Sequence, residues 1–318
     1  MNKQLIIVLG ICILGLLPLF SGDNPMNTSK LTNNEKSDKD ILLETDRQIS
    51  TIAREQGFLK AIIPFLDENA IIFPTNGYPL YGKDFIVKSS EKVEFLGRES
   101  ILTWAPVAAE ISTTSDLGYT YGTFEHQTTN TSSTPKTETA YYLFIWKKNN
   151  TQKWKIVVSQ GLLFISQLGD KPAPNLIDKS KIDSLNKEIV ETELAFSNYS
   201  VTHNRPQAFY NYIAPNGVAI GGNTPRTKET YAELIEKAKL NPDPNAPKTT
   251  LEWKPIYSFV SSSGELAYDY GPWRFTQTDK SGNSQVFYGY FITVWQKQAD
   301  KTWKFIRDCG NECPNPVY

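Results

Sequence analysis

The chain carries one series of motifs twice. The first series contains Leu-Thr-Trp-Ala-Pro at 102–106, Asp-Leu-Gly-Tyr-Thr-Tyr-Gly at 116–122 and Trp-Lys-Ile at 154–156. A constant interval of 149 residues separates each motif from its second copy, with no gap. A repeat of this length predicts two domains of one fold. The anchoring pairs are Trp104 and Trp253, Gly122 and Gly271, Trp146 and Trp295, and Trp154 and Trp303.

The length of 318 residues accommodates two such domains. We place them at 41–168 and 182–313. A proline-containing linker at 169–181 joins them, a polar tether at 23–40 precedes them, and a tail at 314–318 follows. Domains of this size bury enough surface for a core of their own. The net charge of −1, without long runs of one sign, argues against a nucleic-acid partner.

The N-terminal segment 1–22 has the layout of a secretory signal peptide. Lys3 precedes an apolar run of 16 residues, Leu5–Phe20, and Ser21-Gly22 offers small residues for cleavage. The run is short for a spanning helix. The sequence therefore predicts an exported protein. An uncleaved membrane anchor is the alternative, and this segment would be the chain's only contact with a membrane.

Two cysteines, Cys309 and Cys313, remain after such a cleavage. Export permits a disulfide, and Gly310-Asn311 between them predicts a turn that would bring the two sulfurs together. Two unbridged thiols are the alternative. The two histidines, His126 and His203, do not lie near a cysteine pair at ligand spacing. The sequence therefore predicts neither a metal site nor a cofactor.

Apolar periodicity predicts the same element order in both copies: a long helix, a short helix, a short strand, a third helix and four antiparallel strands. Gly57 ends the first helix, and Pro64 breaks the second. The order predicts an α+β fold, with helices packed on one side of a curved sheet. The apolar stripe of the first helix contains Leu42, Thr45, Ile49 and Ile52, with Asp46, Arg47 and Arg54 on other faces. The stripe of its second copy contains Ile182, Leu185, Ile189, Thr192, Phe196 and Tyr199.

These patterns resemble the nuclear transport factor 2-like superfamily, in its SnoaL-like and ketosteroid isomerase-like bacterial branch. The resemblance rests on the helix-first order, the Gly-Lys-Asp-Phe-Ile turn at 82–86, the Asp-Leu-Gly-Tyr-Thr-Tyr-Gly strand and the closing tryptophan hairpin. It covers nearly everything after residue 40. It implies two tandem cone-shaped domains, each with an interior cavity, in a protein of the bacterial periplasm or cell surface. It implies no particular chemistry, because the superfamily contains both enzymes and binding modules.

The acids of the isomerase have no counterparts at the corresponding positions. In the isomerase, a carboxylate base ends the short first strand, and a second acid lies on the strand before the last hairpin. Here those positions fall at 73–74 and 140–143 in the first copy, and at 220–221 and 289–292 in the second, and none is acidic. Proton abstraction needs a positioned base, so this mechanism is unsupported. The paired histidines of the dehydratases are also missing from either copy.

Polar residues on the predicted strands are the candidate ligand-binding residues. One interpretation places them in the two cavities; the other places this face against solvent or the other domain. Glu125 and Arg274 are equivalent positions of opposite charge, which would give two cavities different ligands. Glu125 and Asp308 are the candidates for a buried carboxyl group of raised pKa. The full set is Tyr121, Glu125, Tyr268, Tyr270, Arg274 and Asp308.

Three functional hypotheses follow. The first is an exported module that binds a small hydrophobic or amphipathic molecule. The second is an isomerase, dehydratase or hydrolase acting on a hydrophobic ring. The third is a protein-interaction scaffold whose domains dock through their sheets on each other or on a partner, as an internal pseudo-dimer or as a homodimer.

Overall fold

The computed structural model describes residues 36–93, 100–128, 136–163, 186–221 and 224–314. The described residues form one compact unit. The predicted signal segment 1–22, the tether up to residue 35 and the linker 169–181 lie outside the described residues. Within the described residues, no helix is both long enough and apolar enough to cross a membrane.

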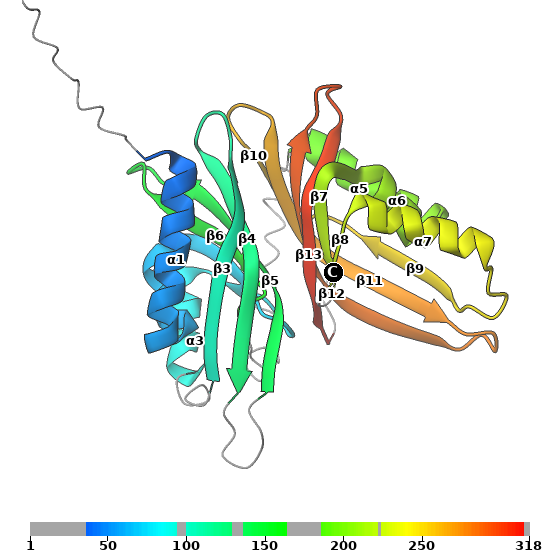
Figure 1. Cartoon of the computed structure of the whole chain (residues 1–318), viewed down its shortest axis with the longest axis horizontal. Coiled ribbons are helices and arrows are strands. Elements are labelled where there is room, and N and C mark those ends of the chain that lie inside the picture. The colour runs from blue at the N-terminus through cyan, green and yellow to red at the C-terminus, as the bar shows by residue number, and fades with distance from the viewer. Residues whose placement is uncertain (1–35, 94–99, 129–135, 164–185, 222–223, 315–318) are drawn as a thin grey trace, which may run out of the picture. The chain divides into compact units, whose positions relative to one another are not determined.

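The first copy begins with helices and ends in a four-stranded meander (Figure 1). Its helices are α1 (Asp38–Gln56), α2 (Phe58–Ile62), the short 3₁₀ helix η1 (Ile63–Phe65) and α3 (Lys83–Val93). Its strands are β1 (Leu66–Phe73), β2 (Leu80–Tyr81), β3 (Ser100–Ile111), β4 (Leu117–Thr128), β5 (Lys136–Lys148) and β6 (Trp154–Gln160).

The second copy repeats that order, except that two shorter strands occupy the positions equivalent to β3. Its helices are α5 (Lys187–Thr202), α6 (Arg205–Tyr212) and α7 (Lys228–Leu240). Its strands are β7 (Ile213–Gly221), β8 (Thr224–Arg226), β9 (Lys248–Trp253), β10 (Tyr257–Val260), β11 (Leu266–Thr278), β12 (Ser284–Lys297) and β13 (Trp303–Cys313).

The two sheets have matching topologies. The strand order is β2-β1-β6-β5-β4-β3 in the first and β10-β11-β12-β13-β7-β8 in the second, where β9 also pairs with β11. Neighbours are antiparallel except β1 with β6 and β7 with β13. Helices cover one face of each sheet (Figure 1). The predicted α+β class and tandem architecture are therefore confirmed.

Local signals explain where the helices begin and end. The Ser37 side chain accepts a hydrogen bond from the Asp40 backbone N–H, so α1 begins at Asp38, earlier than the apolar stripe indicates. Gly57 ends α1 with a φ of 86°, a value that glycine adopts without strain. Pro64 lies in η1, where the α-helix has already ended, as predicted.

The repeated glycine of the Tyr-x-Tyr-Gly strand allows a neighbouring backbone segment to approach closely. A Cβ atom on Gly122 would lie 2.0 Å from the Ala105 carbonyl oxygen. A Cβ atom on Gly271 would lie 1.9 Å from the Lys254 carbonyl oxygen. Both glycines therefore recur because any side chain would collide with the neighbouring backbone.

The buried apolar residues form three clusters. One lies between the helices and sheet of the first copy, around Ile49, Trp104 and Trp146. The second occupies the same place in the second copy, around Phe196 and Trp295. The third contains residues from the helix-free faces of both sheets. The sheets are thus buried on both sides, which explains their long apolar runs.

Candidate functional site

An acidic side chain from the first helix lies inside the first copy. The Asp46 carboxylate accepts hydrogen bonds from Trp104 Nε1 at 2.6 Å and from the Tyr142 hydroxyl at 2.9 Å. Burial raises the pKa of Asp46 to about 6, although these hydrogen bonds oppose the shift. The prediction that Asp46 faces away from the apolar stripe is wrong, because two buried donors hold its carboxylate in the core.

The second copy repeats this contact and adds a second acid. Glu193 accepts hydrogen bonds from Trp253 Nε1 and, at 3.1 Å, from Trp295 Nε1. The Trp295 indole also lies 3.2 Å from Asp269 Oδ1. Burial raises the pKa of both carboxyl groups, and the Glu193 charge raises that of Asp269 further. Two acids so close in an apolar core share a proton rather than both ionising.

Asp308 is a third acid on the helix-facing side of the second sheet. Its Oδ2 accepts a hydrogen bond of 3.1 Å from the Thr293 hydroxyl, and the residue is partly exposed. Burial of the carboxyl group, followed by the nearby Glu193 charge, raises the pKa of Asp308 to about 8. At neutral pH this group is therefore mainly protonated and can donate a hydrogen bond.

The first copy lacks this arrangement, because three equivalent positions differ. Phe144 stands where the second copy has the smaller Thr293, and its side chain is fully buried. With Tyr142 and Trp146 it fills the interior of the first copy. The two interiors therefore differ at these positions: the second copy has two additional carboxyl groups, and a smaller side chain replaces one aromatic ring. The three pairs are Thr120 and Asp269, Phe144 and Thr293, and Ser159 and Asp308.

Three predicted binding residues lie on the opposite face of the sheets. Tyr121, Tyr268 and Tyr270 belong to the cluster formed by the helix-free faces. The Tyr121 ring stacks on Tyr141, with centroids 5.8 Å apart, and the Arg307 guanidinium lies 4.9 Å from the Tyr121 ring centroid. Strand alternation places these rings and the helix-side acids on opposite faces. The interpretation that the rings face the two cone cavities is therefore wrong.

Glu125 and Arg274 also do not line a cavity. Both side chains are exposed, and Arg274 forms an ion pair with Glu252 on the neighbouring strand β9. Each follows a tyrosine of the helix-free face, Tyr121 or Tyr270, by four positions on the same strand, so strand alternation places both on that face and not among the helices. The expectation that Glu125 and Arg274 give the two cavities different ligands is therefore wrong, because neither side chain lines a cavity.

Of the two alternatives for the C-terminal cysteines, the structure has the unbridged thiols. Cys309 and Cys313 are both buried, and no bond joins their sulfurs. The intervening Gly310-Asn311 does not turn, because β13 pairs with β12 without interruption from Arg307 to Cys313. Four residues of extended strand separate Cα atoms by roughly 13 Å, about twice the reach of a disulfide.

The two histidines lie in separate environments. His126 is buried on β4, and burial lowers its pKa. His203 is at the exposed end of α5, where its ring stacks on Tyr199 at a centroid distance of 3.8 Å. Within the described part of the chain, no group of three His, Cys, Asp or Glu residues is placed to hold a metal ion.

The buried helix acids have a signature in the sequence that a search for polar residues on strands overlooks. Glu193 follows Ile189 by four positions and precedes Phe196 by three, so it lies on the apolar stripe itself. Asp46 has the same relationship to Leu42 and Ile49. An acid in the middle of such a stripe predicts a buried carboxyl group with dedicated hydrogen-bond donors.

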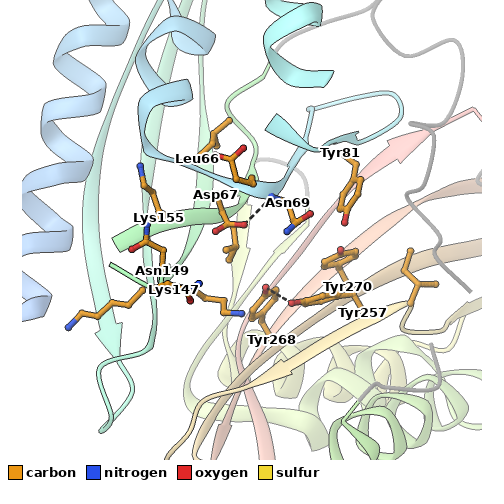
Figure 2. A pocket seen from close by; sticks show the side chains of 15 residues that line it. Leu66, Asp67, Asn69, Tyr81, Lys147, Asn149, Lys155, Tyr257, Tyr268 and Tyr270 are labelled. Carbon is orange, nitrogen blue, oxygen red and sulfur yellow. Dashed lines mark hydrogen bonds between the residues drawn. The ribbon is translucent and has the colours of Figure 1, made fainter. Parts of the chain in front are cut away.

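A pocket lies against the helix-free faces (Figure 2). It has a volume of about 610 Å³, within the usual range for small-molecule sites. Tyr81, Tyr257, Tyr268 and Tyr270 gather on one side of it, and Asp67, Asn69 and Lys147 lie around the rest (Figure 2). Tyr268 and Tyr270, predicted as ligand contacts, therefore line a pocket, although on the face opposite to that expected.

Comparisons with known proteins concern the fold. No family model and no curated protein matches the chain. A nuclear transport factor 2-like superfamily protein from Salmonella enterica matches with 19% identity and a TM-score of 0.32, covering 44% of this chain and 96% of its own. A ketosteroid isomerase-like protein from Erwinia carotovora matches with 18% identity and a TM-score of 0.31, covering 41% and 100%.

A nuclear transport factor 2-like protein of unknown function from Shewanella oneidensis shows 15% identity and a TM-score of 0.30. The match covers 37% of this chain and 93% of the Shewanella protein. Each of these three matches covers less than half of this chain. Such a likeness says nothing about chemistry. Over about two-fifths of its length, this chain is similar in fold to nuclear transport factor 2-like proteins.

Proposed function

We propose that the second copy binds a small hydrophobic or amphipathic molecule in its helix-side interior, with Asp308 as the polar contact. The observation that carries the proposal is the Asp308–Thr293 pair, which stands where the first copy has Ser159 and Phe144. A neutral carboxyl group among aromatic side chains suits a ligand with one carbonyl or hydroxyl oxygen on an apolar frame. The first copy then serves as a structural partner.

Native mass spectrometry of the full chain, purified without denaturation from its own host, tests this proposal. We expect an adduct of defined mass that is released on unfolding. The double substitution Asp308→Ser with Thr293→Phe introduces the residues of the first copy, and should abolish the adduct while the protein stays folded. Glu125→Gln, at an exposed position, is the matched control. An adduct that persists in the double variant, or a wild-type chain that binds nothing from a panel of ring-containing metabolites, would contradict the proposal.

A catalytic role is the second candidate, because the pKa of Asp308 lies close to neutrality. A neutral carboxyl group can donate its proton to a ketone oxygen while a water molecule takes the α-hydrogen, which is the enolisation that an isomerase requires. Solvent-deuterium exchange into a panel of cyclic ketones, followed by NMR, tests it. Exchange should depend on the protein and should disappear in Asp308→Ser. A rate equal to that of the buffer would exclude this proton transfer for the ketones tested.

We also propose that the protein works outside the cytoplasm. The apolar run Leu5–Phe20, preceded by Lys3 and followed by Ser21-Gly22, supports export. Intact-mass measurement of the protein from its host should give a chain that begins near residue 23. A full-length mass in the membrane fraction would instead indicate an anchor.

We propose, finally, that the two copies form an internal pseudo-dimer through their sheets. The shared apolar cluster supports this arrangement, as do hydrogen bonds between the β3–β4 turn and the β10–β11 turn. In these, Thr113 N–H donates to Glu265, and Ser262 N–H donates to Asp116 at 2.8 Å. A monomeric mass in solution, independent of concentration, is expected.

A further inference from the structure

The pocket of Figure 2 has one aromatic wall. The Tyr257 and Tyr270 rings are parallel, with centroids 5.0 Å apart, and Tyr268 lies beside Tyr257 at 5.5 Å. The hydroxyl groups of Tyr257 and Tyr268 are 3.4 Å apart. Tyr81 of the first copy completes this wall (Figure 2). The rings offer a rigid apolar surface with a polar edge, which suits a flat or branched apolar group.

The remaining wall carries opposite charges. Lys147 comes from the end of β5 and Asp67 from β1, and both are half-buried. The Lys147 ammonium lies 3.4 Å from the centroid of the Phe259 ring. Burial lowers the pKa of Lys147, and the charge of Asp67 opposes that shift. The cation and the anion therefore affect each other across the pocket.

Neither of these charges has an ion-pair partner among the residues that the structure describes. The other lysines of the pocket differ: Lys148 pairs with Asp38 at 2.7 Å, and Lys155 donates to the Pro64 carbonyl oxygen at 2.8 Å. Asp67 accepts one hydrogen bond, from the Asn69 backbone N–H at 3.0 Å. Lys147 is attracted by Asp67 and Asp116, but neither carboxylate is in direct contact with it. A half-buried charge whose counter-charges are not in contact is only partly compensated, and a ligand that contacts it with the opposite charge relieves this.

We propose that this pocket binds a small zwitterion with an apolar side chain, of the α-amino-acid class. Its carboxylate pairs with Lys147, its ammonium with Asp67, and its side chain packs on the tyrosine wall. A simple organic anion or cation would neutralise one charge and leave the other desolvated beside it. The site is distinct from the helix-side interior of the second copy, because it lies on the opposite face of the sheet.

Isothermal titration calorimetry of the full chain tests the proposal with three probes: L-phenylalanine, phenethylamine, which lacks the carboxylate, and hydrocinnamate, which lacks the ammonium. L-phenylalanine should bind about tenfold more tightly than either of the others, since each lost charge pair removes a charge-assisted hydrogen bond. Lys147→Met should weaken L-phenylalanine and hydrocinnamate but not phenethylamine. Asp67→Asn should weaken L-phenylalanine and phenethylamine but not hydrocinnamate.

Lys153→Met is the matched control, because Lys153 is an exposed lysine on the neighbouring turn and does not line the pocket. It should leave all three affinities unchanged. Thermal melts of each variant check that the fold is retained. The proposal is overturned if L-phenylalanine does not bind, if all three probes bind equally, or if L-phenylalanine binding is unaffected by both pocket substitutions.

Discussion

Glu193 and Asp269 share one hydrogen-bond donor, the indole N–H of Trp295, at distances of 3.1 and 3.2 Å. Glu193 comes from the first helix of the second copy, and Asp269 from the centre of its sheet. Both residues are fully buried. A carboxyl pair in this position ties the helix to the sheet, and its protonation is coupled to folding.

Stability should therefore depend on pH. In the folded chain, Asp46 holds its proton up to a pKa of about 6 and Asp308 up to about 8, whereas an unfolded aspartate loses it near 3.8. Burial raises the pKa values of Glu193 and Asp269 in the same direction. Between these limits the folded state binds more protons, so the free energy of unfolding should fall as pH rises from about 4 to about 8. Each group contributes up to about 1.4 kcal/mol per pH unit within its own window.

Chemical denaturation at several pH values measures this dependence, and Asp46→Asn should flatten it. Below pH 4 the trend should reverse. Although burial alone would raise the pKa of Asp116, hydrogen bonds from Ser262 and Thr114 lower it, and the stability they provide is lost on protonation. A stability that rises steadily between pH 4 and pH 8 would show that the three acids of the second copy and Asp46 are not buried as described.

Two tryptophans of the first copy should differ in their contribution to stability. Trp104→Phe removes a buried donor to Asp46 and should lower the free energy of unfolding by about 1–3 kcal/mol beyond the loss of ring volume. Trp154→Phe makes the same chemical change, but its indole donates to the part-buried Asp38, so the effect should be below about 1 kcal/mol. Urea denaturation of both variants compares them. Equal effects would argue against a special role for the Asp46 contact.

The repeated glycine should tolerate no side chain. Gly271→Ala places a Cβ atom 1.9 Å from the Lys254 carbonyl oxygen and should destabilise the second copy by about 3 kcal/mol or more. Gly282→Ala is the matched control. That glycine has a φ of 84° and open space around it, so only backbone strain of about 1 kcal/mol is expected. Thermal melting distinguishes the two, and a mild Gly271→Ala variant would refute the close approach of β11 to the backbone at Lys254.

The two C-terminal cysteines should behave as protected thiols. Burial, followed by the nearby Asp308 charge, raises the pKa of Cys309 well above its usual range, which suppresses the reactive thiolate. Cys309 and Cys313 should therefore resist a thiol-specific reagent in the folded protein and react after denaturation without added reductant. Peptide mapping by mass spectrometry assigns the modified residues. A disulfide-linked peptide from the native protein would contradict the uninterrupted β13 strand.

The tandem architecture follows from local features of the sequence. An interval of 149 residues separates Trp104 from Trp253 and Gly122 from Gly271, and this repeat predicts two copies of one fold. The two glycines recur because each makes the same close approach to a neighbouring backbone. Apolar periodicity specified the order of helices and strands, because burial of one helix stripe and of alternate strand positions is a local pattern. These features are readable residue by residue.

Which face of a strand packs on the helices and which packs on the other sheet is decided only in the assembled fold. Alternation groups Tyr121 with Tyr119 and separates both from Thr120, but it does not say which group faces the helices and which faces the second sheet. The exposure of Glu125 and Arg274 and the convergence of Glu193, Asp269 and Asp308 depend on contacts between distant segments. Charge and aromatic content are local properties, whereas burial, hydrogen-bond partners and pKa arise only when those segments meet.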